Sequence, residues 1–144
     1  DYSVMRDCEK ILRILKIKYQ VSIVSAHRTP KRMFEFAESA SKNGFAVIIA
    51  GAGGAAHLPG MVASLATVPV IGVPIESRKL KGLDSLLSIV QMPKGCPTAT
   101  MAINGAFNAG LHAASIIGTF DLKVRSNLEK WKRLQTKSVK KKPK

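Results

Sequence analysis

The stretch AVIIAGAGGAAHLPG, residues 46–60, decides the fold class of this 144-residue chain. Its first five residues are apolar without polar alternation, which is typical of a strand that is covered on both faces of a parallel sheet. Four glycines follow within ten residues, and Pro59 opens a helical pattern that continues to Ala66. A strand, a glycine-rich turn and a helix in this order predict one βα unit of an α/β domain.

The same alternation continues on both sides of this unit. Strands are also expected at Tyr19–Val24, Pro69–Val73 and Thr98–Ile103, and helices at Val4–Leu15, Pro30 to Asn43-Gly44, Asp84–Val90, Ala106–Ile117 and Leu122–Ser138. We therefore predict a three-layer, flavodoxin-like (Rossmann-like) α/β domain with a mostly parallel sheet and right-handed crossovers. The last helix carries Trp131 and extends to a neighbouring subunit, with packing on its own sheet as the alternative.

The order of the elements predicts a strand upstream of Asp1. This chain begins with a helix, whereas a flavodoxin-like sheet of strand order 2-1-3-4-5 begins with an interior strand whose loop lines the ligand crevice. We therefore expect an N-terminally truncated domain over residues 1–119, its C-terminal helix over 120–139, and a basic disordered tail over 140–144.

Composition excludes several classes of protein. Apolar residues make up 46% and charged residues 22%, which excludes a chain that is disordered throughout. The sequence contains no run of 18 or more apolar residues, which argues against a membrane span. Cys8 and Cys96 lack metal-type spacing, which argues against a zinc site or a disulfide framework. The net charge of +14 leaves a nucleic-acid binder as an alternative. More than half of that excess lies in residues 120–144, which favours a solvated tail instead.

The first candidate ligand loop, residues 25–30, has the sequence SAHRTP between a predicted strand and a helix. Arg28 and Ser25 can hold a phosphate at the helix N-terminus, which leaves His27 free for proton transfer. The alternative is a simple helix cap with a solvated His27 and Arg28.

The second candidate loop, residues 51–60, leaves backbone amides accessible to a planar or anionic ligand. Residues Gly51–Ala56 also match a dinucleotide fingerprint, and Glu76 lies 20 residues beyond Ala56, where a ribose-binding acid is expected. A dinucleotide-binding module is therefore a second alternative, although Pro59 lies where the fingerprint helix should already be running.

Four motifs follow one another along the chain: SAHRTP at 25–30, AGAGGAAHLPGM at 50–61, PVIGVP at 69–74 and GLDSLLSIVQMPKG at 82–95. In this order they resemble the class I PurE family, which comprises the N5-carboxyaminoimidazole ribonucleotide mutases and the catalytic domain of phosphoribosylaminoimidazole carboxylase. The resemblance runs from Asp1 to about Gln135. It implies an intracellular enzyme of purine biosynthesis that moves a carboxylate from N5 to C4 of an aminoimidazole ribonucleotide, through carbon dioxide, without a metal or organic cofactor. It also implies a homo-octamer and an ATP-grasp carboxylase domain, fused or separate, as partner.

The resemblance also implies roles for individual residues. His27 is the general acid/base at C4, Arg28 and Ser25 hold part of the phosphate, and Asp1 binds the ribose. The base and carboxylate are lined by Ala52, Gly53 and Leu58, with His57 beside them.

Two departures from the bacterial pattern refine the resemblance. The serines of the family's G-S-x-S-D loop are not in this chain, so half of the phosphate site is outside it. The INGAFNAG loop at 103–110 is about two residues shorter than the bacterial form, and it resembles, like VASL at 62–65, the plant and fungal fused enzymes. We therefore expect a plant-type carboxylase domain, located in the cytoplasm or a plastid.

Overall fold

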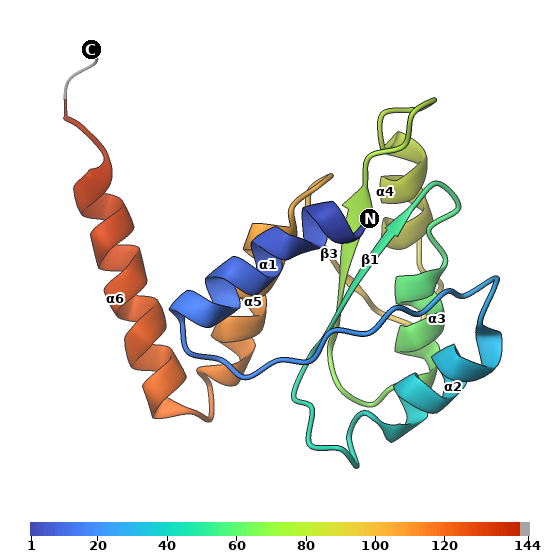
Figure 1. Ribbon diagram of the computed structural model, residues 1–144, viewed down its shortest axis with the longest axis horizontal. Coiled ribbons are helices and arrows are strands. Elements are labelled where there is room, and N and C mark those ends of the chain that lie inside the picture. The colour runs from blue at the N-terminus through green and yellow to red at the C-terminus, as the bar shows by residue number, and fades with distance from the viewer. Residues whose placement is uncertain (142–144) are drawn as a thin grey trace.

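The computed structural model describes residues 1–141, which form a parallel sheet with helices on both faces (Figure 1). The strands are β1 (Ile48–Gly53), β2 (Val70–Ile75) and β3 (Ala99–Thr100). The helices are α1 (Tyr2–Ile14), α2 (Pro30–Ser39), α3 (Leu58–Leu65), α4 (Leu83–Val90), α5 (Ala106–Ile117) and α6 (Leu122–Ser138). Among the described residues, no helix is long and apolar enough to cross a membrane.

The sheet has the order β1-β2-β3, and both pairs are parallel. β1 and β2 are in register from Ile48 opposite Val70 to Gly53 opposite Ile75, so they end together at one edge. β2 is buried along its whole length because it has a strand on each side and helices above and below. The uninterrupted apolar patterns at β1 and β2 therefore correctly predicted parallel strands, although β1 alternates between buried and half-buried residues.

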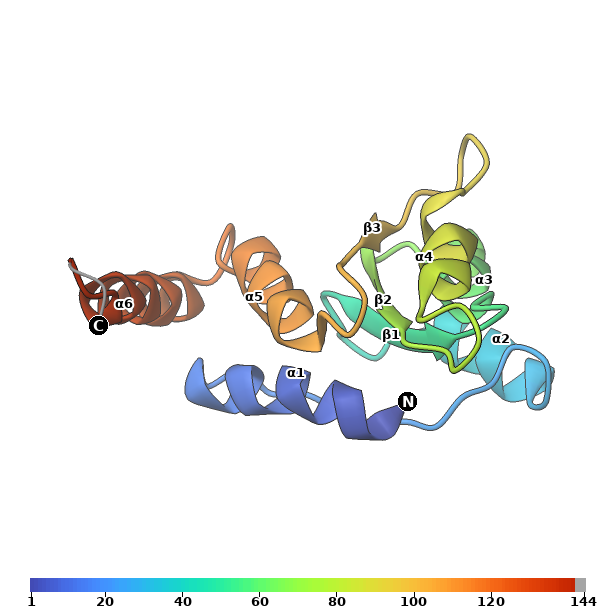
Figure 2. The same cartoon turned by 90° about the horizontal axis from the view of Figure 1, so that it is seen from above.

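The helices form two layers (Figure 2). α1 and α5 pack on the face that Ile71, Val73 and Ile75 present, while α3 and α4 cover the opposite face of β2 and α2 packs on α3. Gly72 allows this second layer to approach closely, because a Cβ there would collide with the Ile89 side chain of α4. The predicted three-layer α/β fold is confirmed.

Most predicted boundaries agree with the structure within one or two residues. α5 and α6 occupy the predicted ranges. β1 continues three residues further than predicted and β2 two, because pairing extends through Gly51–Gly53 and through Pro74 and Ile75. β3 is shorter than the predicted Thr98–Ile103, because only Ala99 and Thr100 pair with β2.

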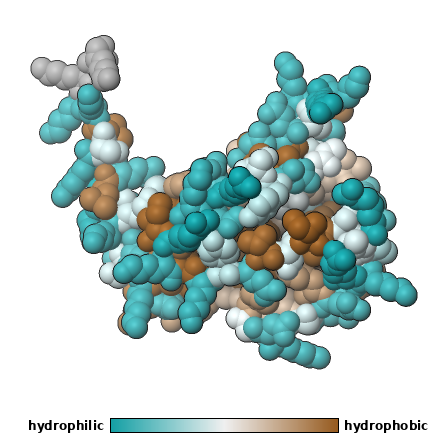
Figure 3. Space-filling model, viewed as in Figure 1, coloured by the Kyte–Doolittle hydropathy of each residue, from teal (hydrophilic) through white to brown (hydrophobic). Residues whose placement is uncertain are grey.

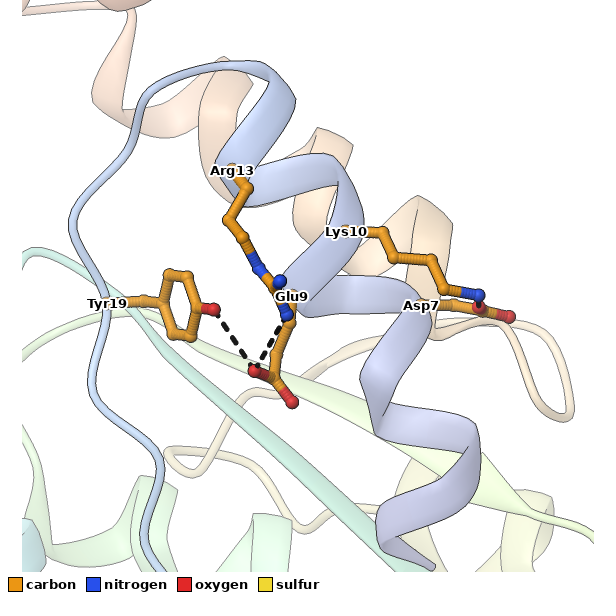
Figure 4. Close-up of polar contacts among 5 residues, drawn as sticks. All are labelled: Asp7, Glu9, Lys10, Arg13 and Tyr19. Carbon is orange, nitrogen blue, oxygen red and sulfur yellow. Dashed lines mark hydrogen bonds and ion pairs between the residues drawn. The ribbon is translucent and has the colours of Figure 1, made fainter.

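The predicted strand at Tyr19–Val24 is wrong for this structure. Residues 17–24 are extended but pair with no strand among residues 1–141, because a groove separates them from β1. Their attachment is through side chains instead: the Tyr19 hydroxyl donates to Glu9 Oε2 at 3.1 Å, and Arg13 also contacts this carboxylate (Figure 4). Val21 and Ile23 remain exposed, and Figure 3 shows apolar side chains at the surface of this face.

The C-terminal helix α6 packs on α5 rather than on the sheet. Asp121 caps it by accepting hydrogen bonds from the amides of Lys123 and Val124 at 2.8 and 3.1 Å. Trp131 packs on Phe107 of α5 with ring centroids 5.9 Å apart, so the alternative that it packs on its own sheet is wrong. Of the predicted tail, residues 140 and 141 are non-helical, and residues 142–144 lie outside the described residues.

Candidate active site

The two predicted ligand loops meet at the edge of the sheet where β1 and β2 end. His27, from the loop before α2, and His57, from the loop after β1, place Nε2 and Nδ1 2.8 Å apart. Their rings pack edge to face with centroids 4.9 Å apart, and both side chains are exposed. When both rings are neutral, one nitrogen donates and the other accepts, so each histidine constrains the other's tautomer.

The first loop is a tight turn around Ser25. The Ser25 hydroxyl accepts from the backbone amide of Arg28 at 3.2 Å and from its Nε at 3.3 Å. Thr29 Oγ1 accepts from the Ser25 amide at 2.8 Å and donates to the Ser25 carbonyl at 3.1 Å. The turn orients the exposed Arg28 guanidinium beside the first turn of α2, where the helix dipole favours an anion.

The second loop offers mainly backbone to a ligand. Ala52 is buried with 8% of its surface exposed, so only its main chain is available. Gly53 ends β1, and a Cβ built on it would lie 3.5 Å from Asp1 Oδ1, so the Asp1 carboxylate lies beside this glycine. Leu58 opens α3 and packs partly into the apolar clusters beneath the loop.

The predicted site residues form two adjoining groups. One group consists of the histidine pair, His27 and His57, with Ser25 and Arg28 beside it. The other consists of Asp1 and Gly53, which lie next to each other. A groove of about 740 Å³ runs below them, and its lining includes Asp1, Ser25, Arg28 and Leu58 but not either histidine. Asp1, the residue most distant in sequence, therefore lies at the same edge as the two loops.

Two polar pairs at this edge were not predicted as part of the site. Asn104 Oδ1 accepts from the Glu76 amide at 2.9 Å, and its Nδ2 donates to Glu76 Oε2 at 3.1 Å. Ser85 of α4 bonds to the loop after β1. The positive φ of 58° at Asn104 follows from a turn, and an N-G dipeptide signals such a turn in the sequence. No local pattern marks Ser85.

The dinucleotide alternative finds no support in this geometry. The fingerprint needs a helix that begins at its third small residue, but α3 begins at Leu58, two residues beyond Ala56. The carboxylate of Glu76 accepts from Asn104.

Within the described residues, no group of three or more His, Cys, Asp or Glu lies close enough to hold a metal ion. Burial raises the pKa of the Cys8 thiol to about 12, and both cysteines are free.

These features define an α/β domain with a candidate ligand site at the carboxyl edge of a parallel sheet, where an imidazole pair and a guanidinium lie on the bordering loops. The AIR carboxylase family matches residues 1–138, and the chain belongs to this family. The family expected from the four sequence motifs is thereby confirmed.

Individual relatives agree with this assignment. The N5-carboxyaminoimidazole ribonucleotide mutase of Escherichia coli strain K12 is 53% identical over 141 residues, which cover 96% of this chain and 83% of that protein. The mutase of Saccharolobus solfataricus is 62% identical over 118 residues, covering 82% of this chain and 75% of that protein. The crystal structure of Treponema denticola PurE matches the fold with a TM-score of 0.86 at 22% identity, covering 95% of this chain and 85% of that one.

Proposed function

We propose that this chain is an N5-carboxyaminoimidazole ribonucleotide mutase of purine biosynthesis, or the domain of a phosphoribosylaminoimidazole carboxylase that performs this step. The observation that carries the proposal is the 53% identity to a mutase of this name across 96% of the chain. The substrate class is an aminoimidazole ribonucleotide with a carboxylate on N5, and the product carries that carboxylate on C4. Carbon dioxide is the group that passes between the two positions.

His27 is the general acid/base of this reaction. The N5–carboxylate bond breaks as the nitrogen gains a proton, and the new carbon–carbon bond forms as C4 loses one, so the reaction is an isomerisation without net proton change. One imidazole that alternates between acid and base can serve both steps. The hydrogen bond between the two histidine rings supports this role, because His57 orients the ring of His27.

The remaining site residues bind the nucleotide. Arg28 and Ser25 hold the phosphate at the N-terminus of α2, and Asp1 binds the ribose. The backbone at Ala52 and Gly53, together with Leu58 and His57, lines the base and carboxylate. A main-chain pocket suits trapped carbon dioxide because it can exclude water without adding side-chain charges.

The working enzyme has one more strand, which lies in the groove between β1 and residues 17–24. The groove supports this proposal because β1 and the residues 18–24 that line its two sides are both extended chain. β1 is an edge strand among the described residues, so its outer backbone groups are free to pair. Asp1 lies beside Gly53, at the carboxyl end of β1, where a parallel strand leading into α1 would end.

The finer identity is that of a plant-type domain, active as a homo-octamer, and working with an ATP-grasp carboxylase domain, fused or separate. It is intracellular, in the cytoplasm or a plastid, and uses no metal or organic cofactor. The domain spans residues 1–119, followed by its C-terminal helix over 120–139 and a basic tail over 140–144. The exposed Leu134 and Val139 on and just beyond α6 support its packing on a neighbouring subunit.

One experiment tests the activity directly. The protein made from its complete coding sequence is incubated with the ribonucleotide carboxylated at N5, and the C4–H proton signal is followed by NMR. Loss of this signal with formation of the C4 carboxylate is expected. A parallel reaction with the uncarboxylated ribonucleotide and ¹³C-bicarbonate separates use of the carbamate from use of free carbon dioxide. Persistence of the C4–H signal in both reactions overturns the proposal.

A second experiment tests the additional strand. Residues 1–144 are compared with a version that carries an apolar strand and the residues G-S-x-S before Asp1, so that Asp1 closes the G-S-x-S-D loop. The short chain should aggregate in light scattering, and the extended chain should form discrete oligomers and be active. A short chain that forms an active octamer alone overturns the additional strand and the ribose role of Asp1.

A further inference from the structure

Ser85, in the first turn of α4, connects the ends of β1 and β2. Its side chain is fully buried, with 0% exposed, although it is polar. The hydroxyl donates to the Ile75 carbonyl at 2.6 Å and accepts from the Gly54 amide at 2.8 Å. Because Ile75 ends β2 and Gly54 follows the last residue of β1, this one hydroxyl joins the carboxyl ends of both strands.

The direction of these two hydrogen bonds is fixed by chemistry. A serine hydroxyl has one proton, and the Ile75 carbonyl can only accept, so that proton points to Ile75. The oxygen lone pairs then remain for the Gly54 N–H. Ser85 is therefore complementary to a loop in which the amide of Gly54 points toward α4.

This direction determines where the carbonyl of Gly53 points. The peptide unit between Gly53 and Gly54 is planar and trans, so its N–H and C=O point in opposite directions. The hydrogen-bond ladder between β1 and β2 gives the same direction. The Ile48 amide donates to the Pro69 carbonyl, and successive residues of β1 direct their backbone groups to opposite sides, so Gly53 faces away from β2. Gly53 thus presents its carbonyl away from β2, toward the outer edge of β1.

We infer that Ser85 is a positioning residue that holds the Gly53–Gly54 peptide in one orientation, so that the backbone at Gly53 lines the ligand site. This inference rests on the proposed function, in which the backbone at Gly53 lines the base. Gly54 has φ of +69°, and a glycine can rotate its peptide at little steric cost, so the loop needs an external constraint.

Ser88, one turn further along α4, provides a matched control. Its hydroxyl lies 2.7 Å from the Asp84 carbonyl within its own helix and 3.4 Å from the carbonyl of Gly54. The short bond within the helix accounts for its proton, so it contributes little to the orientation of the loop. Ser88→Ala removes the same atom from the same helix, next to the same glycine, without releasing the Gly54 amide.

The first measurement does not depend on activity. Amide hydrogen exchange is followed at Gly54 in the wild-type protein, in Ser85→Ala and in Ser88→Ala, all made from the complete coding sequence. Exchange at Gly54 should accelerate at least about tenfold in Ser85→Ala, since its acceptor is lost, and should not change in Ser88→Ala. Unchanged exchange at Gly54 in Ser85→Ala overturns the inference even if the protein shows no mutase activity.

The second measurement separates positioning from stability. Ser85→Ala should lower kcat about tenfold or more with less than about a twofold change in KM, because phosphate and ribose contacts lie elsewhere. Ser85→Thr keeps the hydroxyl but adds a methyl group to a buried site, so it should lower the melting temperature and still restore kcat. If kcat follows the melting temperature across both variants, Ser85 has only a structural role and the inference fails. An inactive wild-type enzyme would overturn the proposed function alone.

Discussion

β2 and residues 17–24 have similar strand-forming sequences but very different structures. β2 is paired on both sides and fully buried. Residues 18–23 are all exposed and unpaired among the described residues, although Val21 and Ile23 are typical of strands. The difference shows that strand formation depends on pairing. Apolar, β-branched residues favour an extended backbone, but that backbone forms a strand only when a neighbouring strand lies at hydrogen-bond distance.

The consequence for the site is unequal support of its two loops. The loop after β1 is tied to β2 and to α4 through Ser85. The loop that carries His27 and Arg28 follows the unpaired segment and is held by its own turn, by α2 and by the contact with His57. We therefore expect the phosphate half of the site to be the less stable half until the groove is filled.

The largest expected effect comes from a charge in β2. Val73→Asp places a carboxylate where no surface is exposed, and it should lower the free energy of unfolding by more than about 4 kcal/mol. Gln20→Asp puts the same carboxylate on the segment that is exposed in residues 1–144 and should change this free energy there by less than about 0.5 kcal/mol. Urea unfolding of residues 1–144 at low protein concentration measures both. Equal losses would show that residues 17–24 are as well packed as β2.

His27→Asn tests the chemistry of the less supported loop. The amide cannot exchange a proton in the working pH range, so turnover should fall about 10²- to 10⁴-fold while the nucleotide still binds. Single-turnover kinetics and calorimetric titration with the ribonucleotide separate the two effects. Turnover close to that of the wild type would remove His27 from the mechanism.

Arg28→Ala tests the phosphate contact on the same loop. Loss of a charge-assisted hydrogen bond should weaken substrate binding by about 1.5 to 3 kcal/mol, seen mainly in KM. Arg32→Ala is the matched control, because Arg32 lies on α2 and donates to the Ile23 carbonyl at 3.1 Å rather than to the site. If both variants have the same KM, the phosphate lies elsewhere.

The smallest effect concerns the two thiols, of which Cys8 is buried and Cys96 is half-buried. With a pKa of about 12, Cys8 is thiolate in only about 10⁻⁴ of molecules at pH 8, so it should resist alkylation in the folded protein. Cys96 is partly exposed and should react first. Mass spectrometry after brief iodoacetamide treatment measures both. Early labelling of Cys8 would indicate that α1 separates readily from α5.

Elements that are marked by a local sequence signal could be predicted, whereas bounds that depend on pairing with a distant strand could not. The Ala-rich stretch 106–117 and the helix from Leu122 were predicted at their observed bounds, because composition and the spacing of apolar residues are local signals. The end of β1 was not, because glycines carry no hydropathy pattern and pairing with β2 carries the strand through Gly53. The strand predicted at Tyr19–Val24 was wrong, because these residues have no neighbouring strand to pair with among the described residues.

For the candidate site, the sequence could locate the two loops but not the contacts between them. Its two loops could be located because they follow strands, and parallel strands end at a common edge. The 2.8 Å contact between His27 and His57, and the proximity of Asp1 to Gly53, required the packed structure. Ser85 could not be found from its neighbours in sequence, since its role depends on how α4 docks beneath a loop 31 residues away.

The contact between α5 and α6 gives the molecule an intrinsic optical reporter. Trp131 is the single tryptophan of the chain, and its indole packs against Phe107 at the α5–α6 interface. Its emission will therefore shift to longer wavelength when α6 leaves α5 and water reaches the ring. The ligand loops lie at the sheet edge, away from α6 (Figure 1). Tryptophan fluorescence in this protein thus follows docking of the C-terminal helix, and nucleotide binding needs a label placed elsewhere.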